Sequence, residues 1–544
     1  MQRSTLAKRA ALLFFLAAAA FYFYGLGHLP FIGPDEPRYA EVAREMYLRG
    51  DMVTPTLGGH TWFEKPALLY WMMIGSYRLF GVSEWTARLG PAICGLLTVL
   101  LIYWAGRRVE KACDGEREAN GLGLWSGVAL ASSLGLIVFS RGASFDIVVT
   151  MTVTLALVCF FVSEIDEKRR GLLLAGFYAG VGASLLAKGL VGIVVPFGVI
   201  GLYYLLRRKW PAKATFVSAA WGVPLALAVA APWYAPVIAR HGWTFLDEFF
   251  IQHHFARYVS NKYHHPQPFY FYLPVMTLLA LPWTVFLVAA LARARRWNWR
   301  EETVESKFHI FALAWLIAPV LFFSFSGSKL PGYVLPALPG AALLVGGRLS
   351  RFIRGEDGSV AMRITGAILL VLTVAGLIYA TDTNEITIAC ALIIVAPLAL
   401  AGAFAIVLKQ RRALRVELIC SAMFISMALA LNCAVAPLAR GESVRDLMQA
   451  ADARGYASTP VFYMLAADRT AEFYAGGRLG YKPDGEPFRF DGAAEVAAAA
   501  RLRGGTALVI IPIVWEKQLT DYSAIETEKL GSNDTLSLFA VRVR

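Results

Sequence analysis

Apolar residues gather in long runs that recur along most of the first 436 positions of the chain. Each run is close to twenty residues long, which is enough for a helix to cross a hydrocarbon layer of about 30 Å. Short polar loops separate most of the runs, and two long loops lie at about 28–84 and 234–268. Run length predicts about thirteen membrane-spanning helices, at 11–27, 85–106, 121–140, 147–162, 171–187, 189–206, 216–233, 269–291, 309–325, 333–347, 364–380, 386–408 and 416–435.

The pattern changes after the last long apolar run. Short apolar runs typical of β-strands now alternate with helical patterns and turn-forming residues. The strand patterns lie at 460–465, 507–512 and 536–543, and the helical ones at 443–454 and 493–503. We therefore expect a transmembrane domain at 1–436 and a small α/β domain at 437–544.

Basic residues decide which side of the membrane each loop occupies. Lys and Arg gather at every second junction between runs, at 107–111, 168–170, 207–209, 293–300 and 348–354. Such clusters mark cytoplasmic loops, so the N-terminus is predicted in the cytoplasm. An odd number of spans then places the C-terminal domain, the two long loops and the short loop containing Asp146 on the outer side.

The net charge of +13 is explained by the same clusters. Because the basic residues follow the membrane loops, we expect membrane lipids as general partners and no nucleic acid. Five of the six cysteines lie within apolar runs, and no metal-type spacing appears, so a disulfide framework is not expected.

The first long loop opens on two adjacent carboxylates, Asp35 and Glu36, at the start of a helical pattern that ends at Gly50. Asp35 suits the N-cap position, and Gly suits the position after a helix. One interpretation is a capped amphipathic helix on the membrane surface. The other is a functional carboxylate at the mouth of a membrane cavity, where a charge is costly unless it is used.

The outer loops carry an unusual set of polar side chains with more cations than carboxylates. Besides Asp35, the set comprises Arg38, Glu64, Lys65, Glu84, Asp146, His253, His254, Arg257, His264, His265, Lys329 and Tyr333. A lysine alone can extend to the interface, and a tyrosine can belong to an aromatic belt. Together they suit a lipid that carries phosphate or pyrophosphate, because cations in a low-dielectric cavity bind phosphate strongly.

The histidines raise the possibility of zinc, since imidazole and carboxylate are normal zinc ligands. A site of His265 with Glu84 or Glu64 would tie the two long loops together. Its role would be structural, and we expect no cofactor for the chemistry.

Three strings in the outer loops resemble the GT-C superfamily of lipid-dependent glycosyltransferases, and more closely the lipid A aminoarabinose transferases. They are Asp35-Glu36-Pro37-Arg38-Tyr39-Ala40-Glu41, Phe63-Glu64-Lys65-Pro66 and Lys329-Leu330-Pro331-Gly332-Tyr333. The resemblance implies a GT-C fold in the bacterial inner membrane, with the C-terminal domain in the periplasm. It implies a donor of undecaprenyl phosphate carrying 4-amino-4-deoxy-L-arabinose, and a phosphate of lipid A as acceptor. The product would be less negative and would protect against polymyxin and other cationic peptides.

The resemblance also assigns roles to residues. Asp35 and Asp146 correspond to acids of the catalytic site. The lipid-phosphate contacts correspond to Lys65, Arg257, Lys329 and Tyr333, and Arg38 is a further candidate contact. Two alternatives remain: an enzyme like the protein O-mannosyltransferases, and a transporter of lipid-linked sugars. We expect the protein to act as a monomer.

Overall fold

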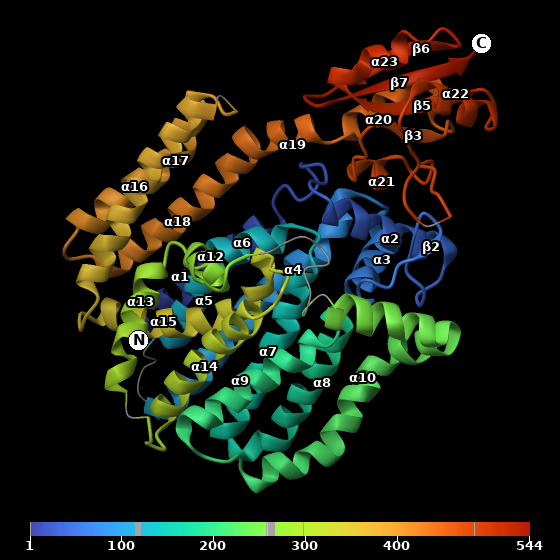
Figure 1. Ribbon diagram of the computed structural model, residues 1–544. Coiled ribbons are helices and arrows are strands. Elements are labelled where there is room, and N and C mark those ends of the chain that lie inside the picture. The colour runs from blue at the N-terminus through green and yellow to red at the C-terminus, as the bar shows by residue number, and fades with distance from the viewer. Residues whose placement is uncertain are drawn as a thin grey trace. The chain divides into compact units, whose positions relative to one another are not determined.

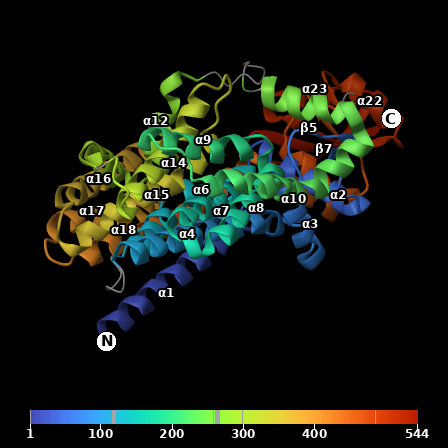
Figure 2. The same ribbon diagram turned by 90° about the horizontal axis from the view of Figure 1, so that it is seen from below.

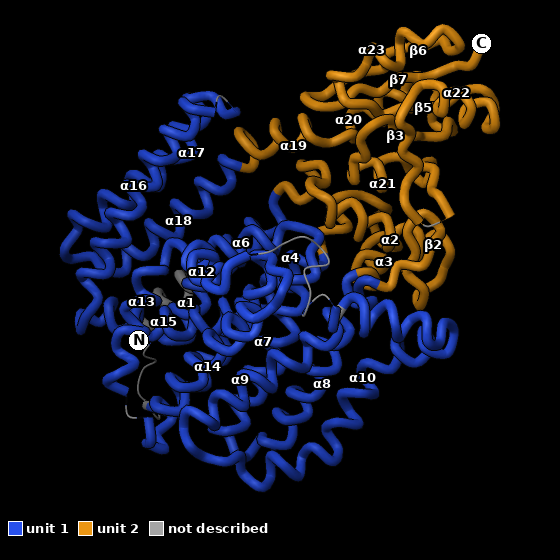
Figure 3. The backbone as a smooth tube through the Cα atoms, viewed as in Figure 1, with its two compact units in different colours: residues 1–24, 64–69, 90–430 blue, residues 25–63, 70–89, 431–544 orange. Residues whose placement is uncertain are grey.

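The computed structural model describes residues 2–114, 121–256, 258, 267–297, 299–383, 385–483 and 485–544. The chain forms two compact units, coloured separately in Figure 3. Unit 1 comprises residues 1–24, 64–69 and 90–430, and unit 2 comprises residues 25–63, 70–89 and 431–544. Most of the first long loop therefore groups with the C-terminal residues, whereas the sequence predicts a single boundary near residue 436.

Unit 1 is built from helices (Figure 1). Before the second long loop these are α1 (Gln2–Phe23), α4 (Glu84–Asp114), α5 (Leu122–Ala131), α6 (Leu134–Arg141), α7 (Phe145–Ile165), α8 (Arg170–Lys188), α9 (Val191–Arg207), α10 (Lys213–Leu246) and η2 (Asp247–Ala256). After it come η3 (Phe269–Phe271), α12 (Tyr272–Leu279), α13 (Thr284–Arg293), η4 (Ala294–Arg296), α14 (Val304–Ser324), η5 (Pro331–Ala337), α15 (Leu338–Arg354), α16 (Ser359–Thr383), α17 (Ile388–Val407) and α18 (Arg412–Ala430). The first six residues of α4 belong to unit 2.

Within the described residues, nine helices are long and apolar enough to cross a membrane, and the number is eleven if each of two bent pairs is one span. The two shorter apolar helices, Leu12–Phe23 and Val191–Arg207, fall on the remaining predicted spans. The eighth predicted span is not straight, because its two halves, Phe269–Leu279 and Thr284–Arg296, meet at 118°. The expectation of a polytopic α-helical membrane protein is confirmed.

Helix α7 lies at the centre of unit 1. Of its most apolar stretch 83% is buried, against 28% for α16. Its sequence is apolar on all sides, as expected of a helix enclosed by other helices. It packs against α8, α9 and η5, whereas α16, α17 and α18 lie side by side in both Figure 1 and Figure 2. The first turn of α7, which carries Asp146, is therefore held by its neighbours.

Unit 2 combines the first loop with a five-stranded sheet. The loop forms α2 (Asp35–Arg49), the short pair β1 (Thr56–Leu57) and β2 (His60–Thr61), and α3 (Leu68–Phe80), whose first two residues belong to unit 1. The C-terminal part contains α19 (Ala436–Glu442), α20 (Arg445–Ala451), β3 (Val461–Met464), α21 (Thr470–Tyr474), β4 (Arg489–Phe490), α22 (Ala493–Arg501), β5 (Thr506–Pro512), α23 (Glu516–Thr520), β6 (Ile525–Ser532) and β7 (Leu536–Val543). The strand order is β4-β3-β5-β7-β6, with β3 parallel to β4 and β5 and the other pairs antiparallel.

The central strand β5 is covered on both faces. Leu508 and Ile510 pack with residues of α20, while Val509 and Ile511 pack with residues of α22. Burial on both faces explains why this run is apolar without alternation. The predicted small C-terminal α/β fold is confirmed in these elements.

The expectation about cysteines is wrong for two of the six. Cys390 and Cys433 are disulfide-bonded, whereas Cys94, Cys113, Cys159 and Cys420 form no disulfide. Both bonded cysteines fall near those ends of their predicted spans that the basic clusters predict to lie on the outer side.

Candidate active site

A cavity of about 310 Å³ in unit 1 collects residues that are far apart in the sequence. Its wall is apolar apart from a few charged and polar groups. The lining residues are Glu64, Lys65, Pro66, Lys188, Leu190, Val191, Val194, His253, Phe255, Tyr258, Phe322, Phe323, Ser326 and Tyr333. Four of the residues that the sequence analysis singles out, Glu64, Lys65, His253 and Tyr333, therefore share one cavity with Lys188.

Lys188 joins this cavity to Asp146. It is the last residue of α8, and its ammonium forms an ion pair with the Asp146 carboxylate. The same ammonium lies 4.6 Å from the centre of the Tyr333 ring, within the range of a cation–π contact. Both ions occupy favourable helix ends, because a carboxylate suits an N-terminus and a cation a C-terminus. A single lysine thus connects the predicted acid with the predicted tyrosine.

The start of α7 fixes the position of Asp146. The Ser144 hydroxyl caps the helix by accepting a hydrogen bond from the Asp146 backbone N–H at 3.1 Å. The Thr150 hydroxyl donates to the Asp146 carbonyl oxygen at 2.6 Å. The predicted outer loop is therefore short and well ordered around the carboxylate.

Gly332, the glycine before Tyr333 in the third string, lies very close to Asp146. A Cβ atom added at Gly332 would lie 2.0 Å from Oδ2 of Asp146. That distance is shorter than real Cβ contacts, so a larger residue here would displace the Asp146 carboxylate or move η5 away from α7. One reason for the glycine in the third string is therefore that it leaves room for the Asp146 carboxylate.

Lys65 and Glu64 form a second ion pair on the cavity wall. Lys65 Nζ lies 2.7 Å from Glu64 Oε1, and each side chain is about 12% exposed. Because the pair is half-buried, salt screens the attraction between the two charges only weakly. Glu64 therefore holds the Lys65 ammonium in place on the cavity wall. Lys65 and Lys188 are thus two cations at one apolar cavity.

Lys329, a predicted lipid-phosphate contact, is hydrogen-bonded to backbone carbonyl oxygens. It is buried and is not among the lining residues of the cavity. Its ammonium donates to the carbonyl oxygens of Ser326 at 2.7 Å and Gln267 at 3.0 Å. These bonds shape the turn between α14 and η5, so a direct contact of Lys329 with phosphate stays a prediction.

In unit 2 the two adjacent carboxylates have different environments. Glu36 accepts hydrogen bonds from Arg88 Nη2 at 2.7 Å and Nε at 3.0 Å. Arg88 is only 3% exposed and also donates to the carbonyl oxygens of residues 26, 29 and 30. Glu36 therefore holds a buried arginine, whereas Asp35 is exposed.

Asp35 is not the N-cap that the sequence predicts. Helix α2 begins at Asp35, and Pro34 occupies the cap position without a side-chain capping bond. Pro34 has helical backbone angles, so the chain enters the helix one residue earlier than expected. The predicted end is confirmed, because Gly50 is the C-cap with φ of 65°. Asp35 therefore keeps an exposed carboxylate at the positive end of the helix dipole.

Arg38 also belongs to unit 2. Its guanidinium lies 5.1 Å from the Trp62 ring centre, and its Nε lies 3.7 Å from Glu472 Oε2. Glu472 is almost fully buried, and burial raises the pKa of its carboxyl while Arg469 opposes the shift. Arg38 thus helps to compensate a buried acid, and its contact with substrate stays a prediction.

Among the described residues, the two carboxylates predicted as zinc ligands already have other partners. Glu64 is paired with Lys65, and Glu84 accepts hydrogen bonds from Tyr474 at 2.9 Å and Arg445 at 3.5 Å. These donors would compete with a metal for the same oxygen atoms. The described part of the chain contains no group of three residues able to hold a metal. His265, and likewise Arg257, lies outside the described residues.

Lys188 is the functional candidate that the sequence analysis missed. It stands alone at an outer junction, between the fifth and sixth predicted spans, where the positive-inside rule predicts few basic residues. An isolated lysine on the side without basic clusters is the signal that identifies it. With Lys65 and an apolar wall beside it, Lys188 can hold a phosphate whose tail is a hydrocarbon chain.

Comparisons with known proteins agree with this chemistry. A family described as dolichyl-phosphate-mannose-protein mannosyltransferase matches residues 64–235. A protein of Pseudomonas aeruginosa (strain UCBPP-PA14), undecaprenyl phosphate-alpha-4-amino-4-deoxy-L-arabinose arabinosyl transferase, is 34% identical over 381 residues, which are 68% of this chain and 65% of that protein. A protein of the same description from Aeromonas salmonicida (strain A449) is 32% identical over 417 residues, 73% of this chain and 72% of that protein.

The fold also matches a solved structure. The crystal structure of ArnT from Cupriavidus metallidurans bound to undecaprenyl phosphate has a TM-score of 0.81 and 25% sequence identity. The match covers 97% of each chain.

Proposed function

Because this chain belongs to the family of undecaprenyl phosphate-α-4-amino-4-deoxy-L-arabinose arabinosyl transferases, we propose that it transfers 4-amino-4-deoxy-L-arabinose from undecaprenyl phosphate to a phosphate of lipid A. One observation carries this proposal: Lys65 and Lys188 line a single apolar cavity in unit 1. The cations suit the phosphate of a lipid-linked donor, and the apolar wall suits its polyprenyl chain.

The proposed reaction forms a bond between an oxygen of the acceptor phosphate and C1 of the sugar. The bond from C1 to the donor phosphate breaks, and undecaprenyl phosphate leaves with the electron pair. Lys65 and Lys188 favour this departure by neutralising the charge on the leaving phosphate. Asp146 holds Lys188, and Tyr333 lies against its ammonium. Arg38, Arg257 and Lys329 are further candidates for contacts with the two anionic substrates.

Asp35 has a different task in this proposal. The acceptor phosphate is already an anion, so it scarcely needs a general base. An exposed carboxylate can instead hold the cationic amine of the sugar or stabilise positive charge that develops at C1. The exposure of Asp35, beside a Glu36 that is committed to Arg88, supports this assignment.

We place the reaction on the periplasmic side of the inner membrane, with the N-terminus in the cytoplasm and the protein acting as a monomer. The alternating basic clusters support this orientation. The disulfide-bonded state of Cys390 and Cys433, at predicted outer ends of spans, supports it independently. Adding a cationic sugar would lower the negative charge of lipid A and reduce binding of polymyxin and other cationic peptides.

Transfer to a protein hydroxyl is the second candidate, favoured by the match of residues 64–235 to the mannosyltransferase family. A serine or threonine hydroxyl must lose a proton, so that reaction requires a base. The phosphate acceptor requires no base, and the described cavity offers two cations, Lys65 and Lys188, on its wall.

Mass spectrometry of lipid A from cells with and without the gene distinguishes the two. Aminoarabinose on lipid A only in cells that carry the gene is the expected result. Unmodified lipid A together with a newly glycosylated protein would favour the second candidate. Elemental analysis of the purified protein tests the predicted structural zinc, whose absence would leave the transfer reaction unaffected.

A further inference from the structure

A second cavity, of about 240 Å³, lies at the opposite end of α14 from the candidate active site, and α15 also lines it. The candidate site uses Phe322 and Phe323 near the end of α14 and Tyr333 before α15. The second cavity uses Glu305 in the first turn of α14 and Arg348 near the end of α15. The two cavities are therefore separate, and the second opens among the basic clusters that predict the cytoplasmic side.

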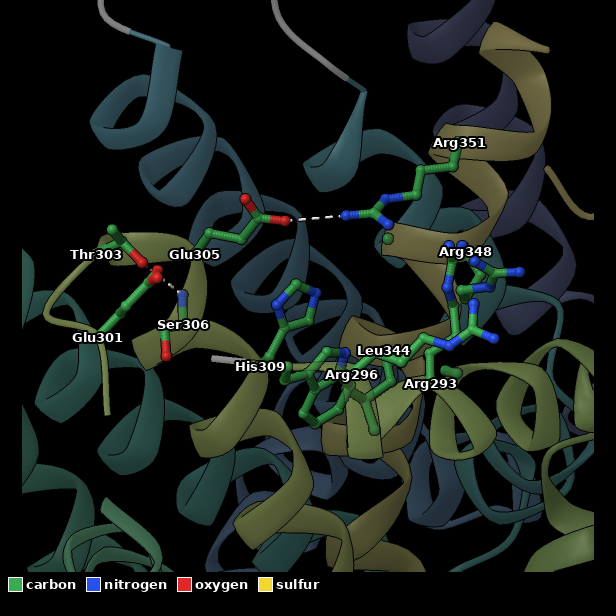
Figure 4. A pocket seen from close by; sticks show the side chains of 13 residues that line it. Arg293, Arg296, Glu301, Thr303, Glu305, Ser306, His309, Leu344, Arg348 and Arg351 are labelled. Atoms are coloured by element: carbon green, nitrogen blue, oxygen red, sulfur yellow. Dashed lines mark hydrogen bonds and ion pairs between the residues drawn. The ribbon is translucent and has the colours of Figure 1, made fainter. Parts of the chain in front are cut away.

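Four arginines line the second cavity (Figure 4). Arg293 comes from α13, Arg296 from η4, and Arg348 and Arg351 from α15. Figure 4 shows Arg348 and Arg351 on one side of the cavity, with Arg351 reaching toward Glu305. Three different elements thus deliver guanidinium groups to one small space.

Carboxylates neutralise only part of this charge. Arg351 Nη2 donates to Glu305 at 2.9 Å. Asp357 accepts from Arg293 at 2.5 Å and from Arg348 at 2.9 Å. With Glu301 on the wall, the four arginines face three carboxylates, so an excess positive charge remains.

Arg348 has donors without acceptors. The residue is 9% exposed, and its Nε and Nη1 atoms are buried with no hydrogen-bond partner among the described residues. A buried donor that lacks a partner is destabilising, more so on a charged group. The arrangement therefore calls for an anionic acceptor that enters the cavity from outside.

We propose that this cavity binds a phosphate group. Guanidinium groups match phosphate oxygens in geometry as well as charge, and two or more arginines commonly share one phosphate. The position at the end of membrane-spanning helices is the level at which lipid headgroups lie. The phosphate belongs either to the headgroup of an anionic lipid or to a soluble phosphate compound, and the following test separates the two sources.

The test is equilibrium binding to the purified full-length protein in detergent micelles. Radiolabelled phosphatidylglycerol is one probe, and radiolabelled inorganic phosphate is the other. Phosphatidylcholine, whose phosphate is balanced by its own choline cation so that the headgroup has no net charge, is the comparison lipid. Selective binding of phosphatidylglycerol that inorganic phosphate fails to displace assigns the site to a lipid headgroup. Saturable binding of inorganic phosphate, with displacement of the lipid, assigns it to a soluble compound. Binding of neither probe overturns the proposal.

Three variants connect the binding to this cavity. Arg348→Gln should weaken binding roughly tenfold or more, the loss expected for a charged hydrogen bond. Arg354→Gln is the matched control, because Arg354 lies on the same helix but pairs with Glu356 and does not line the cavity. Equal binding by these two variants contradicts the proposal.

Asp357→Asn tests the same site in the opposite direction and keeps the proposal testable if Arg348→Gln fails to fold. It removes the carboxylate that competes for Arg293 and Arg348, while an amide oxygen still accepts from the Gly358 N–H. Phosphate binding should tighten several-fold. Unchanged or weaker binding overturns the proposal, and unchanged binding of undecaprenyl phosphate shows that the candidate active site is intact.

Discussion

At the scale of single residues, neighbouring charges have separate tasks. Asp35 and Glu36 are adjacent, yet Glu36 holds the buried Arg88 and Asp35 is exposed. Lys188 forms an ion pair with Asp146 and a contact with the Tyr333 ring. The Lys329 ammonium instead donates hydrogen bonds to backbone carbonyl oxygens. Residue type alone therefore does not distinguish a substrate contact from a structural one.

The adjacent carboxylates provide the first prediction. Asp35→Asn should fold and accumulate normally, because the side chain is exposed and makes no capping bond. Aminoarabinose transfer should fall by about 10²–10³-fold, the usual loss for an electrostatic group at a reacting centre. Lipid A mass spectrometry and an immunoblot of the membrane fraction measure the two quantities.

Glu36→Gln is the matched control, with the opposite outcome. It weakens the partner of a buried arginine, so the free energy of unfolding should fall by roughly 2 kcal/mol or more. The unfolding midpoint of the purified protein measures this loss. Normal stability of Glu36→Gln, or near-normal transfer by Asp35→Asn, would contradict the division of roles.

Lys188 provides the second prediction. Lys188→Met keeps the apolar stem and removes the ammonium from the cavity, so binding of undecaprenyl phosphate should weaken roughly tenfold or more. Lys209→Met serves as control, because Lys209 is exposed and lies outside this cavity. Binding constants from a titration with labelled undecaprenyl phosphate provide the comparison. Equal constants for the two variants would remove Lys188 from the site.

At the scale of elements, close packing between η5 and α7 positions the acid. Gly332 leaves room for the Asp146 carboxylate, and Gly189, with φ of 62°, ends α8 directly after Lys188. Helix ends thus bring the two opposite charges together, where the helix dipoles favour each of them.

Gly332 therefore provides the third prediction. Gly332→Ala places a Cβ atom 2.0 Å from Asp146 Oδ2, and overpacking of this kind typically costs about 1–3 kcal/mol. Donor binding should weaken as η5 moves away from α7. Gly347→Ala is the matched control in the same candidate span of the structure, Pro331–Arg354, since its nearest neighbour, Leu122 Cδ1, would lie 3.8 Å away. The thermal unfolding midpoint and the donor affinity of both variants measure the effect. Identical values for the two variants would show that the Asp146 side chain moves aside at no cost.

Helix α2 provides the fourth prediction. Glu41 is 2% exposed, and burial raises the pKa of its carboxyl to about 8 although Arg44, 2.6 Å away, opposes the shift. Between about pH 4.5 and pH 8 the folded protein therefore holds a proton that the unfolded chain has released. The stability that this proton contributes is present below pH 4.5, declines as pH rises towards 8, and is lost above it.

Glu41→Gln should flatten this decline, because its side chain does not titrate. Unfolding midpoints of both proteins at pH 5.5, 7.0 and 8.5 provide the measurement. Parallel pH profiles for the two proteins would show that the Glu41 carboxyl remains ionised in the folded state.

At the scale of the whole molecule, the number of spans decides whether the first loop and the C-terminal sheet can lie on one side of the membrane. The described helices and bent pairs fall on the predicted spans, and the first loop groups with the C-terminal sheet in one compact unit. An extramembrane unit built from both parts requires that both lie on the same side. An odd number of spans satisfies this requirement.

The fifth prediction concerns that orientation. A reporter that is active only in the cytoplasm, fused after Arg544, should be silent, whereas the same reporter fused after Arg208 should be active. The reason is the concentration of basic residues at 207–209 and the even number of spans between the N-terminus and that loop. Activity of the C-terminal fusion would reverse the orientation and move the proposed reaction to the cytoplasmic side.

The sequence by itself determined the membrane helices and the three strings that indicate the family, and it predicts the side of the membrane on which each loop lies. Span length and hydropathy are local properties, because each helix satisfies its own backbone hydrogen bonds and must match the thickness of the bilayer. The residue types of the outer loops likewise indicated a site for an anionic lipid. These features require no knowledge of which helices meet.

Only the tertiary structure decided the partners of the charged residues. Glu36 meets Arg88, Asp146 meets Lys188, and Lys329 meets backbone carbonyl oxygens. Each pairing joins positions that are distant in the chain or depends on how a turn is folded. A buried charge is stabilised by whichever oppositely charged or polar group the packing places beside it. Hydropathy reports only that a segment is buried, whereas packing determines which side chains remain available to a substrate.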